Sequence, residues 1–185
     1  MASSSKTNDS RPTNKQWTSL HHAGAPLPRL YSSPLTRCLQ TTTHIFSPLF
    51  APPLTFAPTV KELLREQMTD HTCDRRSSAT YIKAHFPAFR LEPGFSERDE
   101  LWRADYWETM EEHVARKYRV LCDLFGNEDG AWLGLTVHSF AIAAILTVVG
   151  AEVYRVREGT SLGVLVKAEK VGDRPVIEAG KLVGY

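Results

Sequence analysis

A long apolar stretch without a charged side chain most restricts how the chain can fold. Residues 131–151 contain no Asp, Glu, Lys or Arg, so we expect most of this stretch to be buried, in a protein core or in a lipid bilayer. A membrane-spanning helix is one alternative, because the stretch is long enough to cross a bilayer. However, Gly134, Thr136, His138 and Ser139 interrupt it, and the flanking charges are acidic rather than basic. A buried strand followed by a buried helix therefore explains the stretch better.

Helix and strand signals alternate along the rest of the chain. Residues 30–32 predict a short strand, and Ser33 and Pro34 predict the N-cap and first position of a following helix. Strands are also predicted at 54–57, 131–137 and 162–171, a helical turn at 59–66, and irregular structure at 68–94. A long helix ending at Gly126 is predicted by apolar residues at spacings of three and four, namely Trp107, Met110, Val114, Tyr118, Leu121 and Phe125. This alternation predicts an α/β fold around a mostly parallel sheet.

Composition limits the partners of such a fold. The 185 residues fit one domain, and a net charge of +1 offers neither a nucleic-acid-binding surface nor a polybasic membrane patch. Cys38, Cys73 and Cys122 are far apart and form no C-x-x-C pair, which favours a reducing compartment, and we expect a cytoplasmic protein. Residues 1–16 are polar and are expected to be disordered or irregular, with a transit peptide as the alternative.

Two predicted strand ends run directly into helix starts and carry side chains that can bind an anion. Arg37 follows the strand at 30–32, and His138 ends the strand at 131–137. Ligands bind at the carboxyl ends of parallel strands, where helix N-termini also point. Each residue also has an ordinary explanation, Arg37 as a surface side chain and His138 as a hydrogen-bonded core histidine. Glu66, which ends a short turn, is by itself a solvated carboxylate.

Several segments, taken together, resemble the histidine phosphatases, the phosphoglycerate mutase-like superfamily. Residues 33–42, SPLTRCLQTT, resemble the family's S-P-L-x-R-x-x-Q-T motif, and residues 136–139, TVHS, resemble the motif of its second histidine. The fungal and plant branch of the family is similar at 64–66, 71–77 and 101–105, and the family's final strand is similar to 165–169. The resemblance covers most of the chain.

The resemblance implies a three-layer α/β/α sandwich and a phosphomonoester hydrolase. In the family, one histidine attacks phosphorus, two arginines and a second histidine hold the phosphoryl oxygens, and a carboxylic acid protonates the leaving oxygen. By motif, Arg37 is expected to be the second phosphate-binding arginine, His138 the second histidine and Glu66 the proton donor, with Ser139 also binding phosphate. The expected ligand is phosphate or a small phosphorylated metabolite, with no cofactor and no metal.

The sequence departs from the family at the motif that supplies the nucleophile. The family opens with a strand ending in R-H-G, whereas this sequence contains no Arg-His dipeptide. The resemblance therefore implies a truncated domain over residues 17–185 that lacks the first, central strand beside the strand ending at His138. His21 and His22 are poor replacements, because no apolar strand precedes them. Phe140 stands where the family usually has glycine, which could crowd the phosphate pocket.

Two functions remain open. The first is a phosphatase of this lineage, inactive or strongly impaired in this chain unless an upstream segment supplies R-H-G. The second is a non-catalytic protein that binds phosphorylated ligands or a partner. Two other chemistries are weakly supported: a metal site at His71 and Cys73 lacks a third ligand nearby, and a Ser-His-Asp hydrolase lacks a G-x-S-x-G motif.

Overall fold

The computed structural model describes residues 27–127, 132–154, 156–171 and 174–183, and the expectations for residues 1–16 lie outside this part. Its elements follow in the order β1 (Arg29–Ser32), α2 (Thr36–Phe46), η1 (Ser47–Leu49), β2 (Thr59–Val60), η2 (Glu62–Leu64), η3 (Thr72–Asp74), α3 (Ala79–His85), β3 (Arg90–Leu91), α4 (Met110–Asn127), β4 (Leu133–Thr136), α5 (Ser139–Val148), β5 (Gly163–Val171) and β6 (Arg174–Val183), where η marks short 3₁₀ helices. None of the helices described is both long and apolar enough to cross a membrane.

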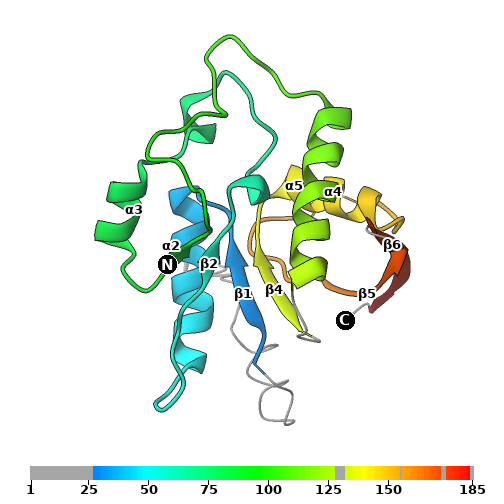
Figure 1. Ribbon diagram of the computed structural model, residues 1–185, viewed down its shortest axis with the longest axis horizontal. Coiled ribbons are helices and arrows are strands. Elements are labelled where there is room, and N and C mark those ends of the chain that lie inside the picture. The colour runs from blue at the N-terminus through cyan, green and yellow to red at the C-terminus, as the bar shows by residue number, and fades with distance from the viewer. Residues whose placement is uncertain (1–26, 128–131, 155, 172–173, 184–185) are drawn as a thin grey trace, which may run out of the picture.

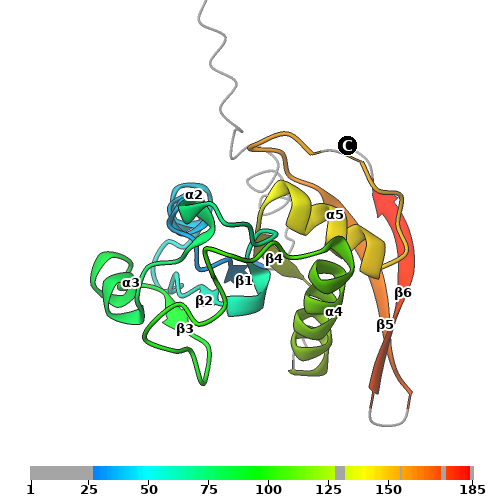
Figure 2. The same cartoon turned by 90° about the horizontal axis from the view of Figure 1, so that it is seen from above.

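A parallel sheet flanked by helices forms the centre of the molecule (Figure 1). Its strand order is β3-β2-β1-β4, and each neighbouring pair runs parallel. Helices α2 and α4 lie on opposite sides of the β1–β4 pair (Figure 2). The strands β5 and β6 form a separate antiparallel hairpin. The predicted α/β class with a parallel sheet is therefore confirmed.

Two hydrophobic clusters hold the sheet against its helices. The larger cluster joins the β1–β4 pair to α4, α5 and β5, and its buried members are Tyr31, Leu64, Val120, Leu121, Leu124 and Val149. The smaller cluster lies between α2, β2 and α3, and consists of Leu39, Val60, Ile82 and Phe89. The uncharged stretch at 131–151 enters the larger cluster through β4 and α5, as its composition predicted. Helix α5 ends before Gly150, which has a φ of +66° that favours glycine.

The pairing of β1 with β4 brings the two expected ligand-binding strand ends together. Leu30 pairs with Gly134, and Ser32 pairs with Thr136. A Cβ atom at position 134 would lie 2.8 Å from Cδ2 of Leu30, so a larger residue here would require the Leu30 side chain to shift. Among the described residues, no second strand pairs with the other edge of β4.

The start of α2 differs from its prediction. The helix begins at Thr36 with Leu35 as its N-cap, whereas Ser33 was expected to be the cap. The Ser33 hydroxyl lies 3.4 Å from the backbone nitrogen of Leu35, which is too long for an effective cap, and its stronger partner is His138 at 2.8 Å. A long-range contact therefore replaces the local cap.

The prediction of a strand at 54–57 is also wrong. The second strand of the sheet is β2, which lies two residues further along the chain and pairs with β1 through Thr59 and Val60. Phe56 packs instead in the smaller cluster, with its ring edge-on to Phe89. Packing of an aromatic side chain therefore decides which residues of this segment join the sheet.

Regular structure within residues 68–94 was not predicted. Helix α3 is capped by Ser78, whose hydroxyl accepts a hydrogen bond from the backbone nitrogen of Tyr81 at 3.1 Å. This cap was visible in the sequence as a signal for a helix start. The strand β3 contains only Arg90 and Leu91, too few residues to show a pattern.

Helix α4 exists as predicted but buries a different face. Trp107, which precedes the helix, and Met110 and Tyr118 were placed on the apolar face, yet their exposed fractions are 61%, 41% and 42%. Arg116 and Lys117, which the same helical spacing places outside the predicted apolar face, are buried instead. These two cations bind backbone carbonyl groups of residues 63–66, so a polar contact with a distant segment determines which face points inward.

Candidate functional site

The site forms where β1 and β4 end side by side. The backbone nitrogen of Ser33 donates to the carbonyl oxygen of Thr136 at 3.0 Å, which extends the strand pairing by one residue. His138 follows with extended backbone as the N-cap residue of α5. Arg37 lies in the first turn of α2, close to the same point. Parallel strand ends thus bring together two residues that are 101 positions apart, as expected for a ligand site in such a sheet.

The imidazole of His138 is buried among three side chains. Nε of Arg37 donates to Nδ1 at 3.1 Å, and Nε2 lies 2.8 Å from Oγ of Ser33 and 3.3 Å from Sγ of Cys38. A guanidinium has no acceptor, so Nδ1 must carry the lone pair and Nε2 the proton. Burial, together with the positive charge of Arg37, lowers the pKa of His138 to about 3. The ring is therefore neutral at physiological pH.

Arg37 reaches from α2 to the segment around η3. Its Nη1 donates to the carbonyl oxygen of Cys73 at 2.7 Å, and its Nη2 lies 3.5 Å from a carboxylate oxygen of Asp74. The other oxygen of Asp74 accepts from the hydroxyl of Thr69 at 2.7 Å. The Arg37 side chain is still 46% exposed, whereas that of Asp74 is only 9% exposed. Arg37 can therefore meet an anion from solvent, but a buried carboxylate restrains its guanidinium.

Glu66 lies at the N-terminus of α5. One carboxylate oxygen accepts from the backbone nitrogen of Ala141 at 2.9 Å, and the other from that of Phe140 at 3.3 Å. Burial raises the pKa of Glu66, although backbone donors from Gln67, Phe140 and Ala141 oppose this effect. A carboxyl group with a raised pKa is suited to hold and deliver a proton. The carboxylate occupies the helix position that an anionic ligand could otherwise take.

The sequence also led to expectations for Ser139 and Phe140 at the start of α5. Ser139 is the first residue of α5 and is exposed beside His138. Phe140 is 54% exposed, so its side chain is not packed into the buried part of the site. Three of the four expected residues, Arg37, His138 and Glu66, are held by side-chain hydrogen bonds around one helix N-terminus, and Ser139 is the exposed first residue of that helix.

Three residues of this site were missed by sequence reasoning. Ser33 was assigned to a helix cap; its place directly after a strand, as the first residue of the SPL motif, was the available signal. Asp74 lies within a segment that resembles the family, but no role was inferred for it. Cys38 follows Arg37 and contacts His138; burial raises the pKa of its thiol to about 12, so it stays protonated and is a poor nucleophile.

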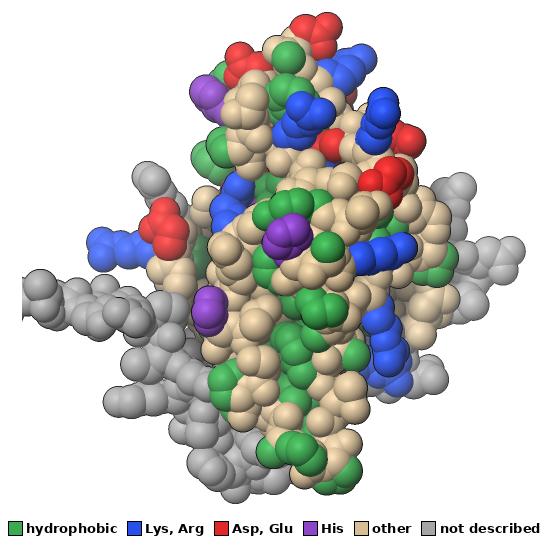
Figure 3. All heavy atoms as spheres, turned by 90° about the vertical axis from the view of Figure 1, so that its left-hand side faces the viewer, with side chains coloured by type: hydrophobic (Ala, Val, Ile, Leu, Met, Phe, Trp, Pro, Cys, Tyr) green, Lys and Arg blue, Asp and Glu red, His purple; other side chains and the backbone are tan. Residues whose placement is uncertain are grey.

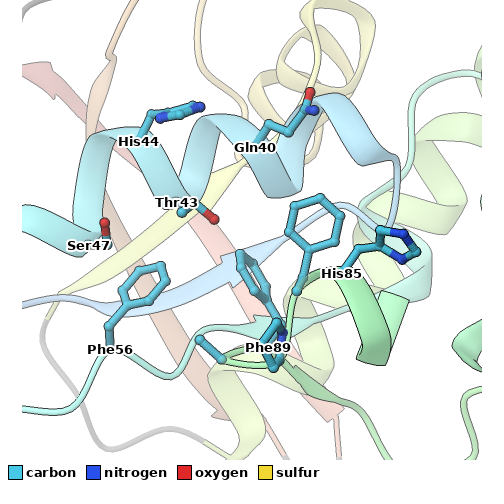
Figure 4. Close-up of a pocket in the computed structure, with 10 residues that line it drawn as sticks. Gln40, Thr43, His44, Ser47, Phe56, His85 and Phe89 are labelled. Atoms are coloured by element: carbon cyan, nitrogen blue, oxygen red, sulfur yellow. The ribbon is translucent and has the colours of Figure 1, made fainter. Parts of the chain in front are cut away.

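A hollow lies on a different part of the molecule from this site. It has a volume of about 250 Å³, lies between α2 and the end of α3, and is lined by aromatic rings and neutral polar groups such as Phe56, Phe86, Phe89, Gln40 and Thr43 (Figure 4). None of its lining residues is Asp, Glu, Lys or Arg. The face that α2 and α3 present shows charged side chains mainly in its upper part, with hydrophobic side chains below (Figure 3). This hollow therefore lacks the fixed charge that a phosphate site needs.

Comparison with known proteins supports the sequence resemblance. The chain is 41% identical over 161 residues to a probable phosphoglycerate mutase of Arthroderma benhamiae, covering 86% of this chain and 48% of that protein. It is 31% identical over 153 residues to the phosphomutase-like protein 3 of Candida albicans, covering 82% of this chain and 47% of that protein. A phosphoglycerate mutase-like protein of Arabidopsis thaliana is 47% identical over 55 residues, covering 30% of this chain and 20% of that protein.

These matches are to individual proteins and cover only part of each one. No protein-family model matches the chain. The chain spans about half the length of the two fungal relatives. Within that span, the matched chain folds as a parallel α/β sheet, and its Arg37, His138 and Glu66 gather at one helix start. The chain is therefore similar to fungal and plant proteins that are named probable phosphoglycerate mutase, phosphomutase-like protein or phosphoglycerate mutase-like protein.

Proposed function

We propose that this chain binds the phosphoryl group of a small phosphorylated compound at Arg37 and His138, beside the N-terminus of α5, where Glu66 already binds the backbone nitrogens of Phe140 and Ala141. Arg37, His138 and Ser139 bind the phosphoryl oxygens. Glu66 protonates the leaving oxygen once a nucleophile is also present. The observation that carries the proposal is the convergence of Arg37, His138 and Glu66 around this one helix start. A guanidinium, an imidazole N–H and a carboxyl group with a raised pKa are the groups that phosphoryl transfer requires besides a nucleophile.

The nucleophile is the component that this site lacks. The sequence contains no Arg-His dipeptide. His138 is a poor substitute, because its Nδ1 lone pair accepts from Arg37 and its Nε2 is protonated toward Ser33. Attack on phosphorus needs a free lone pair aligned with the leaving group. We therefore expect the chain on its own to bind phosphate with little or no turnover.

Within the part of the chain that the structure describes, one edge of β4 has no strand partner, which supports a role for an additional strand. β4 pairs only with β1 among the described residues, and it leads directly to His138. A strand added at that edge would end near the site, where the carboxyl ends of parallel strands meet. A segment outside this sequence that ends in Arg-His-Gly would supply the missing nucleophile and first arginine there.

A non-catalytic role is the second candidate. The observation that favours it is the restraint of Arg37 by Asp74 and Cys73, together with the engagement of both His138 nitrogens. Such a site can recognise a phosphorylated ligand without transforming it. Addition of a strand carrying Arg-His-Gly separates the two candidates, because only the enzyme lineage gains turnover from it.

Anion binding tests the shared part of both candidates. Isothermal titration with inorganic phosphate and with vanadate is expected to show weak binding that falls at least about tenfold in Arg37→Ala, since a charge-assisted bidentate contact is lost. Arg90→Ala is the matched control, because Arg90 is an exposed arginine on β3 at the far edge of the sheet. Equal affinity in the wild type and Arg37→Ala, or no binding by a folded chain, contradicts the proposal.

Turnover is tested separately with an aryl phosphate. We expect negligible hydrolysis and no acid-labile phosphohistidine after incubation with substrate. Hydrolysis at a rate comparable to an intact homologue, abolished by His138→Ala, would show that the chain has rebuilt its active site.

A further inference from the structure

One arginine of α4 binds the main chain of the segment that carries Glu66. Residues 65–68 follow the 3₁₀ helix η2 and form no helix or strand themselves. Arg116 is 2% exposed, and its guanidinium donates to the carbonyl oxygens of Leu63 and Arg65 at 3.1 Å each and of Glu66 at 2.8 Å. Its remaining donors bind the carboxylate of Glu108. Because a guanidinium has five N–H donors, this set uses all of them.

Glu108 binds the next residues of the same segment. Its carboxylate accepts from Nε of Arg116 at 2.6 Å and from the backbone nitrogen of Met68 at 3.1 Å. Its backbone nitrogen donates to the carbonyl oxygen of Met68 at 2.8 Å, and its carbonyl oxygen accepts from the side-chain amide of Gln67 at 2.8 Å. Arg116 and Glu108 therefore fix the chain on both sides of Glu66.

Lys117, beside Arg116 on α4, adds a third point of attachment. Its buried ammonium group donates to the carbonyl oxygens of Leu63 and Arg65. Burial and the nearby charge of Arg116 lower the pKa of Lys117. Burying two cations is unfavourable unless their donors are satisfied, so the carbonyl groups of residues 63–66 are matched to them.

The main-chain carbonyl group and the carboxylate of Glu66 are thus bound by different helices. Arg116 of α4 binds its main-chain carbonyl, and the first turn of α5 binds its carboxylate through Phe140 and Ala141. The first turn of α5 also follows directly on His138. A shift of the segment away from α4 would draw the carboxylate away from these backbone donors and toward solvent.

We propose that Arg116, together with its partner Glu108, is a positioning residue that sets the carboxyl group of Glu66 against the start of α5. Arg116 touches neither the phosphoryl site nor His138 in any contact described, and acts through the main chain of the Glu66 segment. The proposal rests on the proposed function in that Glu66 is the proton donor there. The placement of the Glu66 carboxyl group can be measured without substrate.

Arg76 provides a matched control for Arg116. It is also buried, at 4% exposure, and also binds a glutamate, since its Nε donates to Glu62 at 2.6 Å. Its other donors bind the carbonyl oxygens of Ser77, Ser96 and Arg98, which belong to a different segment. Replacing either arginine by lysine keeps the charge and removes several hydrogen bonds, so both variants should lose comparable stability.

The test follows the Glu66 carboxyl group by carbon-detected NMR across pH, with Glu66→Gln to assign its signal. In the wild type we expect a midpoint above that of an ordinary glutamate, consistent with the burial of the group. In Arg116→Lys the midpoint should fall toward the ordinary value, because the carboxyl group moves into solvent. In Arg76→Lys the midpoint should stay at the wild-type value although thermal stability falls.

Each result decides the proposal. An unchanged midpoint in Arg116→Lys, or an equal shift in Arg76→Lys, shows that Arg116 only stabilises the fold. If Arg116→Lys does not fold, Glu108→Asp takes its place, because it keeps the negative charge, shortens the side chain that binds Arg116 and Met68, and predicts the same downward shift. The measurement needs neither phosphate nor turnover, so a failure of phosphate binding would contradict the proposed function and leave this result standing.

Discussion

Nε of Arg37 donates a hydrogen bond to Nδ1 of His138 over 3.1 Å, so the expected phosphate-binding arginine also fixes the tautomer of the expected second histidine. Because Nδ1 accepts, Nε2 must be the protonated nitrogen, and it faces Ser33 and Cys38. The positive charge of Arg37 also contributes to the low pKa of His138, after burial. The two residues therefore form one electrostatic unit.

This unit makes a prediction for Arg37→Ala. Removal of the guanidinium removes a positive charge and admits water to the ring, so the pKa of His138 should rise from about 3 toward its ordinary value. Nitrogen-detected NMR of the histidine side chains measures both the pKa and the tautomer. The wild type should show the Nε2-protonated form through neutral pH. A His138 signal with the same pKa in both proteins contradicts the interpretation.

Asp74 is expected to weaken anion binding at Arg37. Its buried carboxylate lies 3.5 Å from Nη2 of Arg37 and therefore opposes an incoming phosphate. Asp74→Asn keeps the hydrogen-bonding shape and removes the charge, so phosphate should bind about two- to fivefold more tightly at low salt, the range of a partly exposed charge pair. Asp70→Asn is the control, because Asp70 is exposed in the same segment and its ion-pair contact is with His71. Equal effects of the two substitutions contradict a specific role for Asp74.

Two buried histidines make stability depend on pH. Burial lowers the pKa of His138 to about 3 and that of His113 to about 2, whereas the ordinary value is 6.5. Below about pH 6.5 the unfolded chain binds protons at these residues and the folded chain does not, so the free energy of unfolding falls as pH is lowered. The slope should approach about 1.4 kcal/mol per pH unit for each histidine. The raised pKa of Glu66 acts in the opposite direction, because the folded chain protonates this carboxyl group before the unfolded chain does as pH is lowered.

A single substitution separates the two histidines. Neither ring nitrogen of His113 has a hydrogen-bond partner among the described residues, and the ring is fully buried. His113→Leu should therefore retain or raise stability at neutral pH and should roughly halve the pH slope. Chemical denaturation at a series of pH values measures both quantities. A slope that is unchanged in His113→Leu would mean that other groups control the acid sensitivity.

The sequence predicted the parts of the fold that depend on local signals. The uncharged stretch at 131–151 identified β4 and α5, and the short apolar segment before Ser33 identified β1. These elements are buried on several sides, so their composition alone is informative. The adjacency of their ends also allowed Arg37 and His138 to be expected at one site.

The parts that failed depend on contacts between distant segments. Helical spacing placed Tyr118 inward and Arg116 outward on α4, because periodicity treats a charged residue as solvent-exposed. The carbonyl groups that Arg116 binds lie about fifty positions earlier in the chain, on a segment without regular structure. Ser33 was likewise assigned by a local capping rule, whereas its partner is His138. No local pattern contains these pairings.

The unpaired edge of β4 leads to a final prediction about the 185-residue chain expressed alone. β4 has one strand partner among the described residues, and its Leu133 and Leu135 pack only partly buried against the larger hydrophobic cluster. Unpaired backbone groups at an edge promote pairing with another chain, and each buried unsatisfied group costs about 1–3 kcal/mol. We therefore expect marginal stability or concentration-dependent self-association, measured by light scattering and thermal unfolding. Leu165, which is 63% exposed on β5 and does not belong to the sheet that contains β4, offers a control, because Leu165→Lys should leave association through the β4 edge unchanged. A monomer that unfolds cooperatively above about 60 °C, high for a mesophile domain, contradicts this expectation.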